Sequence, residues 1–381
     1  MRSDREITMI QLGSVVSSSI IGVGILPLPL FAVRAGGAGA PLVAMLGSMI
    51  GFAGIWLLVA LGKRFPRETF VQYSQSIVGK WPAAVGSLLI IVYFTVLTAF
   101  GAREFGEVVI TSVLKNTPVE VTVIVMLLLT AVSCRQDLTA FAYIQYFYLP
   151  VILVPAWLIV ILSLKNADFI NLLPLWGNEP QGIWRGGLSI ANLFQTSFVI
   201  SCIIPAMKHP NKALIPCVWG TVLAGAMYVA IVAAAVGVFG AEEIRLLLWP
   251  TLELAKTTSL PANVLERMDA AFLSIWVTAV FTTLHCSYTL TVVSMADLFK
   301  LKDYRALPIF LLPLVFMLAM QPQSIVQMYT TIHFIGQLGL LLTIGYPAVL
   351  LLIALARGKR SDGVDRKSLE KNGLPDLPAS D

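Results

Sequence analysis

The chain carries little charge for its length. Only 12% of its 381 residues are Asp, Glu, Lys or Arg, whereas 57% are hydrophobic. Because a soluble domain has about 25% charged residues, this composition excludes an ordinary soluble protein. Apolar runs of about 18 residues or more recur along the sequence, and each is long enough to cross a bilayer as a helix. Their periodicity is helical, which excludes a porin-like barrel. The composition therefore predicts an all-α polytopic membrane protein in contact with the lipid bilayer.

Residues for catalysis and metal binding are also scarce. The three histidines are widely scattered, and the sequence contains neither an HExxH pair nor a nucleophile paired with a base. We therefore expect no enzyme activity, no metal and no other cofactor. The four cysteines fall in or beside apolar runs, with a spacing that fits neither a disulfide framework nor a zinc site. Among these residues, His285 is the clearest functional candidate, because ionisable groups at membrane depth are rare.

The apolar runs predict ten transmembrane spans. Basic residues are concentrated in the segments that would face the cytoplasm if both termini lie there. The net charge of +5 is explained by these loops and requires no nucleic-acid partner. No small-residue cleavage site follows the first six residues, so the first span is expected to remain in place rather than act as a signal peptide. The predicted spans are approximately 7–31, 41–61, 83–109, 119–133, 138–164, 186–207, 214–239, 268–296, 307–320 and 326–356.

Two of these spans are interrupted by polar or helix-breaking residues. The first contains Ser17–Pro29, with three serines, two glycines and two prolines, and the sixth contains Asn192–Ser201. Backbone groups freed within a membrane must face protein or a cavity, and paired broken helices indicate a transporter-type binding site. An ordinary proline kink is the alternative for the first interruption alone.

The positions of the interruptions predict a 5+5 inverted repeat with broken helices 1 and 6, as in the LeuT-like amino-acid transporter fold. The repeats would span about 7–164 and 186–356 within a single transmembrane domain, 1–356. The charged segment 357–381 is expected to be a disordered cytoplasmic tail. Two shorter stretches, 70–78 and 241–248, have the spacing of amphipathic helices and are expected at the membrane surface.

The sequence resembles a known family at several motifs. Besides Ile21–Pro29, the matching stretches are FPRETFVQYSQSIVGKWPAAVGSLLIIVYF from Phe65, NLLPLWGN from Asn171, LLWPTLELAK from Leu247 and VLERMDAAFLSIWVTAVFTT from Val264. The chain resembles the B-subunit of bacterial spore germinant receptors, the spore-permease branch of the amino-acid/polyamine/organocation superfamily. The resemblance implies a germinant-sensing subunit in the spore inner membrane. It also implies a larger A-type subunit and a lipoprotein C-type subunit as partners, and amino acids or other small nutrients as ligands.

The predicted ligand site lies between the two broken spans and is closed by the third and eighth. Freed N–H groups and helix N-termini favour a carboxylate, and glycines allow close backbone approach. Helix–helix packing is the common alternative role for each hydroxyl. The candidate ligand-binding residues are Ser18, Gly22, Gly24, Tyr93, Leu97, Gln195, Thr196, Ser197, Phe198, Thr282, Thr283 and Ser287.

Two functions are compatible with this sequence. One is a sensing subunit that binds a small neutral amino acid, such as alanine, and signals by conformational change. The other is an autonomous amino-acid transporter coupled to protons or sodium, and the fold cannot separate the two. No acidic residue lies well within spans one, six or eight, which weakens coupling through a carboxylate. Arg103 and Glu104 are expected to pair with the charged cluster at 266–269, at the start of span eight.

Overall fold

A computed structural model describes residues 6–177, 180–257 and 268–361, and the side chains of 180–181 and 268–271 are outside the described part. Within these ranges the secondary structure is helical, apart from an isolated bridge between Ile7 and Met207. The α-helices are α1 (Met9–Ile20), α2 (Leu28–Gly36), α3 (Ala40–Arg64), α4 (Phe70–Val78), α5 (Lys80–Ser112), α6 (Val119–Ser133), α7 (Leu138–Ser163), α8 (Pro180–Ala191), α9 (Ile200–Ile203), α10 (Leu214–Ile244), α11 (Pro250–Thr257), α12 (Met268–Leu298), α13 (Leu307–Ala319), α14 (Ile325–Leu340) and α15 (Tyr346–Ala356).

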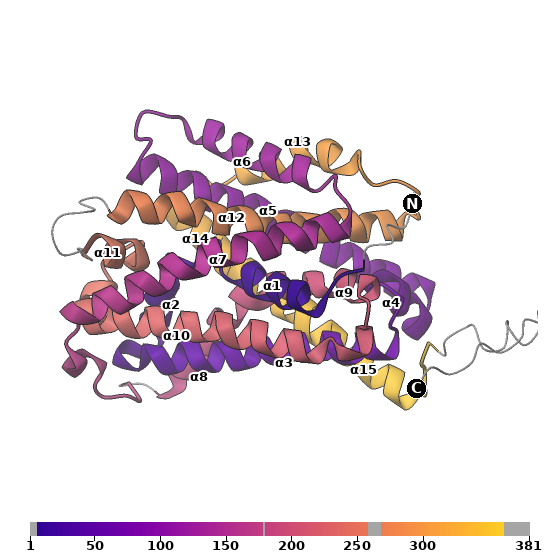
Figure 1. The fold of residues 1–381 in the computed structure, drawn as a ribbon, viewed down its shortest axis with the longest axis horizontal. Coiled ribbons are helices and arrows are strands. Elements are labelled where there is room, and N and C mark those ends of the chain that lie inside the picture. The colour runs from indigo at the N-terminus through magenta and orange to yellow at the C-terminus, as the bar shows by residue number, and fades with distance from the viewer. Residues whose placement is uncertain (1–5, 178–179, 258–267, 362–381) are drawn as a thin grey trace, which may run out of the picture.

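The long helices lie along one axis of the molecule, with α11 at one end and α4 at the opposite end (Figure 1). Seven helical segments in the described ranges are long and apolar enough to cross a membrane, and three shorter apolar helices, α1, α6 and α13, accompany them. Large apolar side chains remain exposed along these helices, as on Phe310 of α13 and Leu129 of α6. Such a surface suits lipid rather than water, and the chain is an integral membrane protein.

The predicted interruption of the first span is present. Helix α1 ends at Ile20, a 3-10 turn (η1, Val23–Ile25) follows, and α2 begins at Leu28. Proline lacks an N–H and clashes with the preceding helical turn, so Pro27 and Pro29 favour a new helix start here, with Pro29 in the first turn of α2. The sequence therefore encodes this break locally.

The sixth span is interrupted in a different way. Helix α8 ends at Ala191, and the chain tightens into a 3-10 helix, η5 (Asn192–Val199), before α9. A 3-10 stretch within a longer helix often marks a hinge or strain. The predicted polar interruption is thus a tighter winding of the helix rather than an opened segment.

Three shorter segments bear on the details of the sequence predictions. Helix α4 forms at 70–78 as expected, and Phe70, Tyr73 and Ile77 of its apolar face are buried against the bundle. A short helical segment begins at Ala241 as predicted, because the non-helical backbone of Gly240 (φ 71°, ψ 164°) separates it from the long part of α10, but it ends at Ile244 rather than at 248. A π-helical turn, η9 (Leu341–Gly345), divides the last predicted span into α14 and α15.

Candidate functional site

Hydrogen bonds in both directions join the end of α1 to α10. The Tyr228 hydroxyl donates to the carbonyl oxygen of Ile20 at 2.5 Å, and the Ser17 hydroxyl donates to the carbonyl of Gly220 at 2.9 Å. Since a helix end leaves its last carbonyls without intrahelical partners, Tyr228 satisfies one of the groups that the break creates. Sequence reasoning missed Tyr228, which no local pattern distinguishes from an ordinary core tyrosine.

A buried glutamine joins the broken span to α12. The Ser18 hydroxyl lies 2.5 Å from Gln145 Oε1, and Gln145 Nε2 donates to the carbonyl of Thr282 at 3.1 Å. The hydroxyls of Thr282 and Thr283 each lie 3.5 Å from the Ser18 carbonyl. The sequence analysis missed Gln145, although a lone amide in the apolar run 138–163 was a usable signal. The structure therefore brings Ser18, Thr282 and Thr283 together at the hydrogen bonds of Gln145, which link α1 to α12.

The two glycines of the break allow very close packing. A Cβ on Gly22 would lie 1.7 Å from Thr283 Oγ1, and a Cβ on Gly24 would lie 2.4 Å from a methyl carbon of Leu193. Side chains are not accommodated at such distances without movement of the neighbours. Because Gly22 has no side chain, the broken backbone can pack directly against α12. Gly24 allows the same close packing against η5.

Tyr93 and Gln195 bind each other. The Tyr93 hydroxyl donates to Gln195 Oε1, and Gln195 Nε2 donates to the carbonyl of Gly336 at 2.9 Å. Gly339 lies against both side chains, because a Cβ there would come within 2.5 Å of each. This contact connects α5, η5 and α14 at the level of the predicted site.

The remaining predicted residues are buried or partly buried, mostly in contact with protein. The Ser197 hydroxyl donates to the Phe194 carbonyl at 2.6 Å, and the Ser287 hydroxyl lies 2.7 Å from that of Thr98. Phe198 packs on Phe70, with ring centroids 5.0 Å apart, towards the α4 end of the bundle. Thr196 is buried beside these residues, and Leu97 packs partly buried against the core.

A small cavity lies beside η5, on the side that faces α3 and η9. Gly51 and Gly54 of α3 line it together with Gln195, Ser197 and Thr343. It has room for about one water molecule. Three candidate residues, including Phe198, thus border a cavity that faces α3 and η9 rather than α1.

His285 is buried on α12 between aromatic rings. Its ring centroid lies 4.8 Å from that of Phe141 and 5.5 Å from that of Phe281. Cys134 lies next to the His285 backbone, with its sulfur 3.9 Å from the carbonyl oxygen. The imidazole therefore belongs to the α6–α7–α12 contact. Among the described side chains, no group of three or more His, Cys, Asp or Glu could hold a metal ion.

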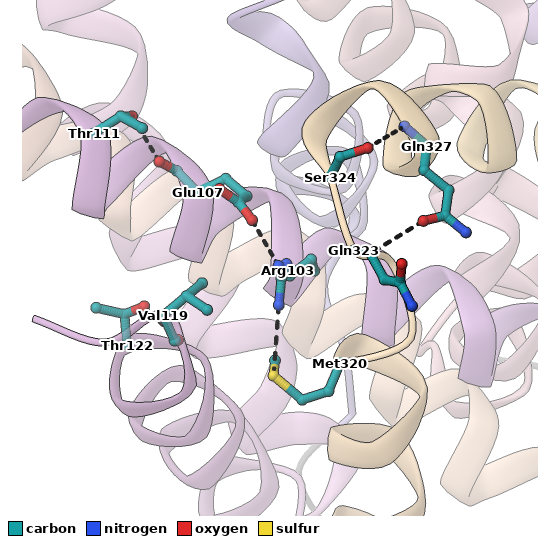
Figure 2. A network of polar contacts seen from close by, with 9 residues as sticks. All are labelled: Arg103, Glu107, Thr111, Val119, Thr122, Met320, Gln323, Ser324 and Gln327. Carbon is teal, nitrogen blue, oxygen red and sulfur yellow. Dashed lines mark hydrogen bonds and ion pairs between the residues drawn. The ribbon is translucent and has the colours of Figure 1, made fainter.

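A polar cluster lies near the α11 end of the bundle. Arg103 Nη2 pairs with Glu107 at 2.8 Å, and Nη1 lies 3.5 Å from the sulfur of Met320 (Figure 2). Glu104 accepts from the Tyr329 hydroxyl at 3.1 Å. The predicted pairing of this cluster with Glu266, Arg267 and Asp269 involves side chains outside the described residues. Within the described part, Glu107 is the ion-pair partner of Arg103.

The fold and its broken helices define a class of membrane protein. The structure matches that of Mhp1, described as a nucleobase-cation-symport-1 family transporter in a closed conformation with bromovinylhydantoin bound, with a TM-score of 0.67. The match has 14% sequence identity and covers 91% of this chain and 78% of the Mhp1 chain. At this identity the likeness concerns the fold alone, which is that of LeuT-type transporters.

Sequence comparison gives the family. The model for the spore germination protein family, the spore permeases, matches residues 6–328, and the chain belongs to this family. Spore germination protein YndE of Bacillus subtilis is 25% identical over 350 residues, which cover 92% of this chain and 96% of YndE. Spore germination protein B2 of the same strain is 23% identical over 79% of this chain and 82% of its own. GerLB of Bacillus cereus is 24% identical over 84% of this chain and 87% of its own. These proteins are described as germination proteins and as a transporter, not as enzymes.

Proposed function

We propose that this chain is the nutrient-sensing membrane subunit of a spore germination receptor. It binds a small neutral amino acid or a similar nutrient between the α1–α2 break and η5, and it signals by changing conformation. The observation that carries this proposal is the contact between two interrupted helices, one early in each half of the chain. Family membership supplies the germination context.

The proposed architecture has ten spans in two inverted halves of five, about 7–164 and 186–356. Seven long and three short apolar helices support this number. Both ends of the described chain lie at the α4 end, because Ile7 pairs with Met207 while the Ser361 N–H donates to Arg64 at the end of α3. Gly62 of α3 also faces Ile204 near Met207, and this arrangement of the ends supports the proposed even number of crossings. Both termini are proposed to be cytoplasmic, in the spore inner membrane.

The chemistry around Gly22 suits a small zwitterion. The side chains gathered there carry hydroxyl, phenol and amide groups, from Ser18, Tyr228, Gln145 and Thr283. Backbone N–H groups freed between α1 and α2 would receive a carboxylate, and the carbonyls ending α1 would receive an ammonium. The Thr283 side chain lies beside both Gly22 and the Ser18 carbonyl, so its hydroxyl would contact a ligand held at the break.

The subunit is proposed to act with A-type and C-type receptor subunits. Its relatives include spore germination proteins B2 and A2 of Bacillus subtilis, whose names are compatible with receptor assemblies. Pull-down from solubilised spore membranes should recover both partner types. Recovery of the protein alone, with germination intact in strains lacking the partners, would contradict this assignment.

An autonomous amino-acid transporter, coupled to protons or sodium, is the second candidate. The likeness to a transporter fold favours it, and the Thr282 and Thr283 hydroxyls beside the Ser18 carbonyl are oxygen ligands of the kind that hard cations prefer. The deciding experiment measures alanine uptake by vesicles containing the purified protein and alanine-triggered germination of spores that lack the gene. Normal germination without the gene, together with concentrative uptake, would replace the sensing function by transport.

A further inference from the structure

A chain of hydrogen bonds connects a buried carboxyl to the broken span. Trp249 Nε1 donates to the Tyr329 hydroxyl at 2.9 Å, and Tyr329 donates to Glu104 Oε1 at 3.1 Å. Two residues after Trp249, the Thr251 hydroxyl donates to the Ile25 carbonyl at 2.7 Å, and the Thr251 N–H donates to the Leu26 carbonyl at 3.3 Å. The segment 249–251 therefore binds Glu104 through Tyr329 on one side and the α1–α2 break on the other.

The direction of this chain is fixed by its chemistry. An indole N–H can only donate, so the Tyr329 oxygen accepts from Trp249 and its hydrogen is available for Glu104. A donor of this kind stabilises an ionised carboxylate, because hydrogen bonds to charged groups are about twice as strong as neutral ones. A neutral Glu104 would hold Tyr329, and hence Trp249, less firmly.

Among the residues that the structure describes, no cation pairs with Glu104. Glu104 is 5% exposed, and its neighbour Arg103 already pairs with Glu107, so this stretch of α5 carries one negative charge in excess. On α11, Glu253 and Lys256 pair with each other at 2.7 Å. On α14, the nearest titratable groups are Tyr329 and, one turn further on, the exposed His333. A buried carboxylate without a cation is costly, and taking up a proton removes that cost.

We infer that Glu104 is a proton-binding site whose occupancy controls how tightly segment 249–251 covers the broken span. When Glu104 is ionised, segment 249–251 at the start of α11 is held against the carbonyl groups of Ile25 and Leu26. When Glu104 takes a proton from the solution, the bond from Tyr329 weakens, and the segment is released from the break. A metal cation fits this position poorly, because it needs several oxygen ligands, whereas the Tyr329 hydroxyl points a hydrogen at Glu104. The inference adds regulation by protons to the nutrient site proposed above.

The test measures access to the break in the purified full-length protein without nutrient. A cysteine introduced by Ile25→Cys reports whether segment 249–251 covers the break. Its labelling rate by a soluble maleimide is normalised at each pH to that of an exposed reference cysteine. In this background, labelling should become about fivefold faster from pH 8 to pH 5, corresponding to the difference between a charged and a neutral hydrogen bond. Glu104→Gln should give the fast rate at both pH values, and so should Tyr329→Phe and Trp249→Phe.

Two matched variants act as controls. Glu120→Gln removes an exposed carboxyl of α6, and His333→Gln removes the exposed imidazole near Tyr329. Both should keep the parental pH dependence. Retention of that dependence in Glu104→Gln, its loss in His333→Gln, or a response to sodium instead of pH would each overturn the inference.

A second measurement covers the case in which Ile25→Cys does not fold. Infrared difference spectra of the otherwise unaltered protein between pH 8 and pH 5 should show a protonated-carboxyl band of a buried group, separate from the signal of the exposed carboxyls, that Glu104→Gln abolishes and Glu120→Gln keeps. Persistence of that band in Glu104→Gln would contradict the proposal. Because neither readout involves nutrient or germination, failure of the proposed sensing function would leave these results unchanged.

Discussion

Replacing Gly22 is the sharpest test of the proposed ligand site. In Gly22→Ala the new Cβ would lie 1.7 Å from Thr283 Oγ1, 2.6 Å from Thr283 Cβ and 3.1 Å from Cγ2. Rotation of the threonine cannot relieve the contact with its own Cβ, so α12 and the broken segment must separate. Overpacking of this kind costs about 1–3 kcal/mol. That cost corresponds to a change of roughly 5- to 150-fold in the equilibrium constant between the arrangement in which α12 contacts the broken segment and the arrangement in which the two are apart.

We expect Gly22→Ala to raise the alanine concentration needed for half-maximal germination and Gly22→Val to abolish the response. The assay is a dose–response curve in spores lacking the native gene, at matched expression, with size-exclusion profiles to check folding. Thr283→Gly removes both the hydroxyl and the Cβ, so the double variant Gly22→Ala/Thr283→Gly should regain part of the folding stability lost to the steric contact, while its nutrient response stays weaker than that of the parent because the Thr283 hydroxyl is missing.

Gly345→Ala is the matched control, because no atom lies within 4 Å of a Cβ added there. It should respond like the parent. If Gly22→Val also responds like the parent while remaining folded, the nutrient is bound elsewhere and the central proposal is wrong.

Three further predictions concern the same bundle. Thr283→Ala should raise the half-maximal nutrient concentration about tenfold, the effect of losing one hydrogen bond of ~1.4 kcal/mol to the ligand, and an unchanged curve would remove this residue from the site. Gln145→Leu should destabilise the purified protein by about 1–3 kcal/mol, because it leaves buried polar partners unpaired. Thermal unfolding would compare the loss of stability in Gln145→Leu with that in Gln136→Leu, at an exposed position. Equal losses would refute the stabilising role of the Gln145 hydrogen bonds. Cysteines introduced at Trp176 and Ser361 should be labelled from opposite sides of the membrane, whereas labelling from one side would contradict the inverted topology.

The sequence by itself determined the features that depend on neighbouring residues. Pro27 and Pro29 lack N–H donors and cannot continue α1, so the break at 21–27 was predictable. The Thr69–Gln72 capping box starts α4 within one residue of the predicted helix. Apolar runs determined the membrane class and the positions of the long helices, because a bilayer imposes both length and hydrophobicity.

Only the tertiary structure decided which polar groups meet. Ser18 and Gln145 are 127 residues apart, and Tyr93 and Gln195 are 102 apart. Their pairing depends on how each rigid helix is rotated and offset against its neighbours, which no local pattern records. The same holds for Thr251, which binds carbonyls that become free only because α1 has ended.

The two interrupted helices show the division clearly. The first break follows from proline and glycine chemistry within a few residues. The second is a tightened 3-10 segment, and its Gln195 side chain takes up its position because Tyr93 and the Gly336 carbonyl are brought to it from other helices. Local covalent restrictions thus determined where the chain breaks, and packing between distant helices decided what each break contacts.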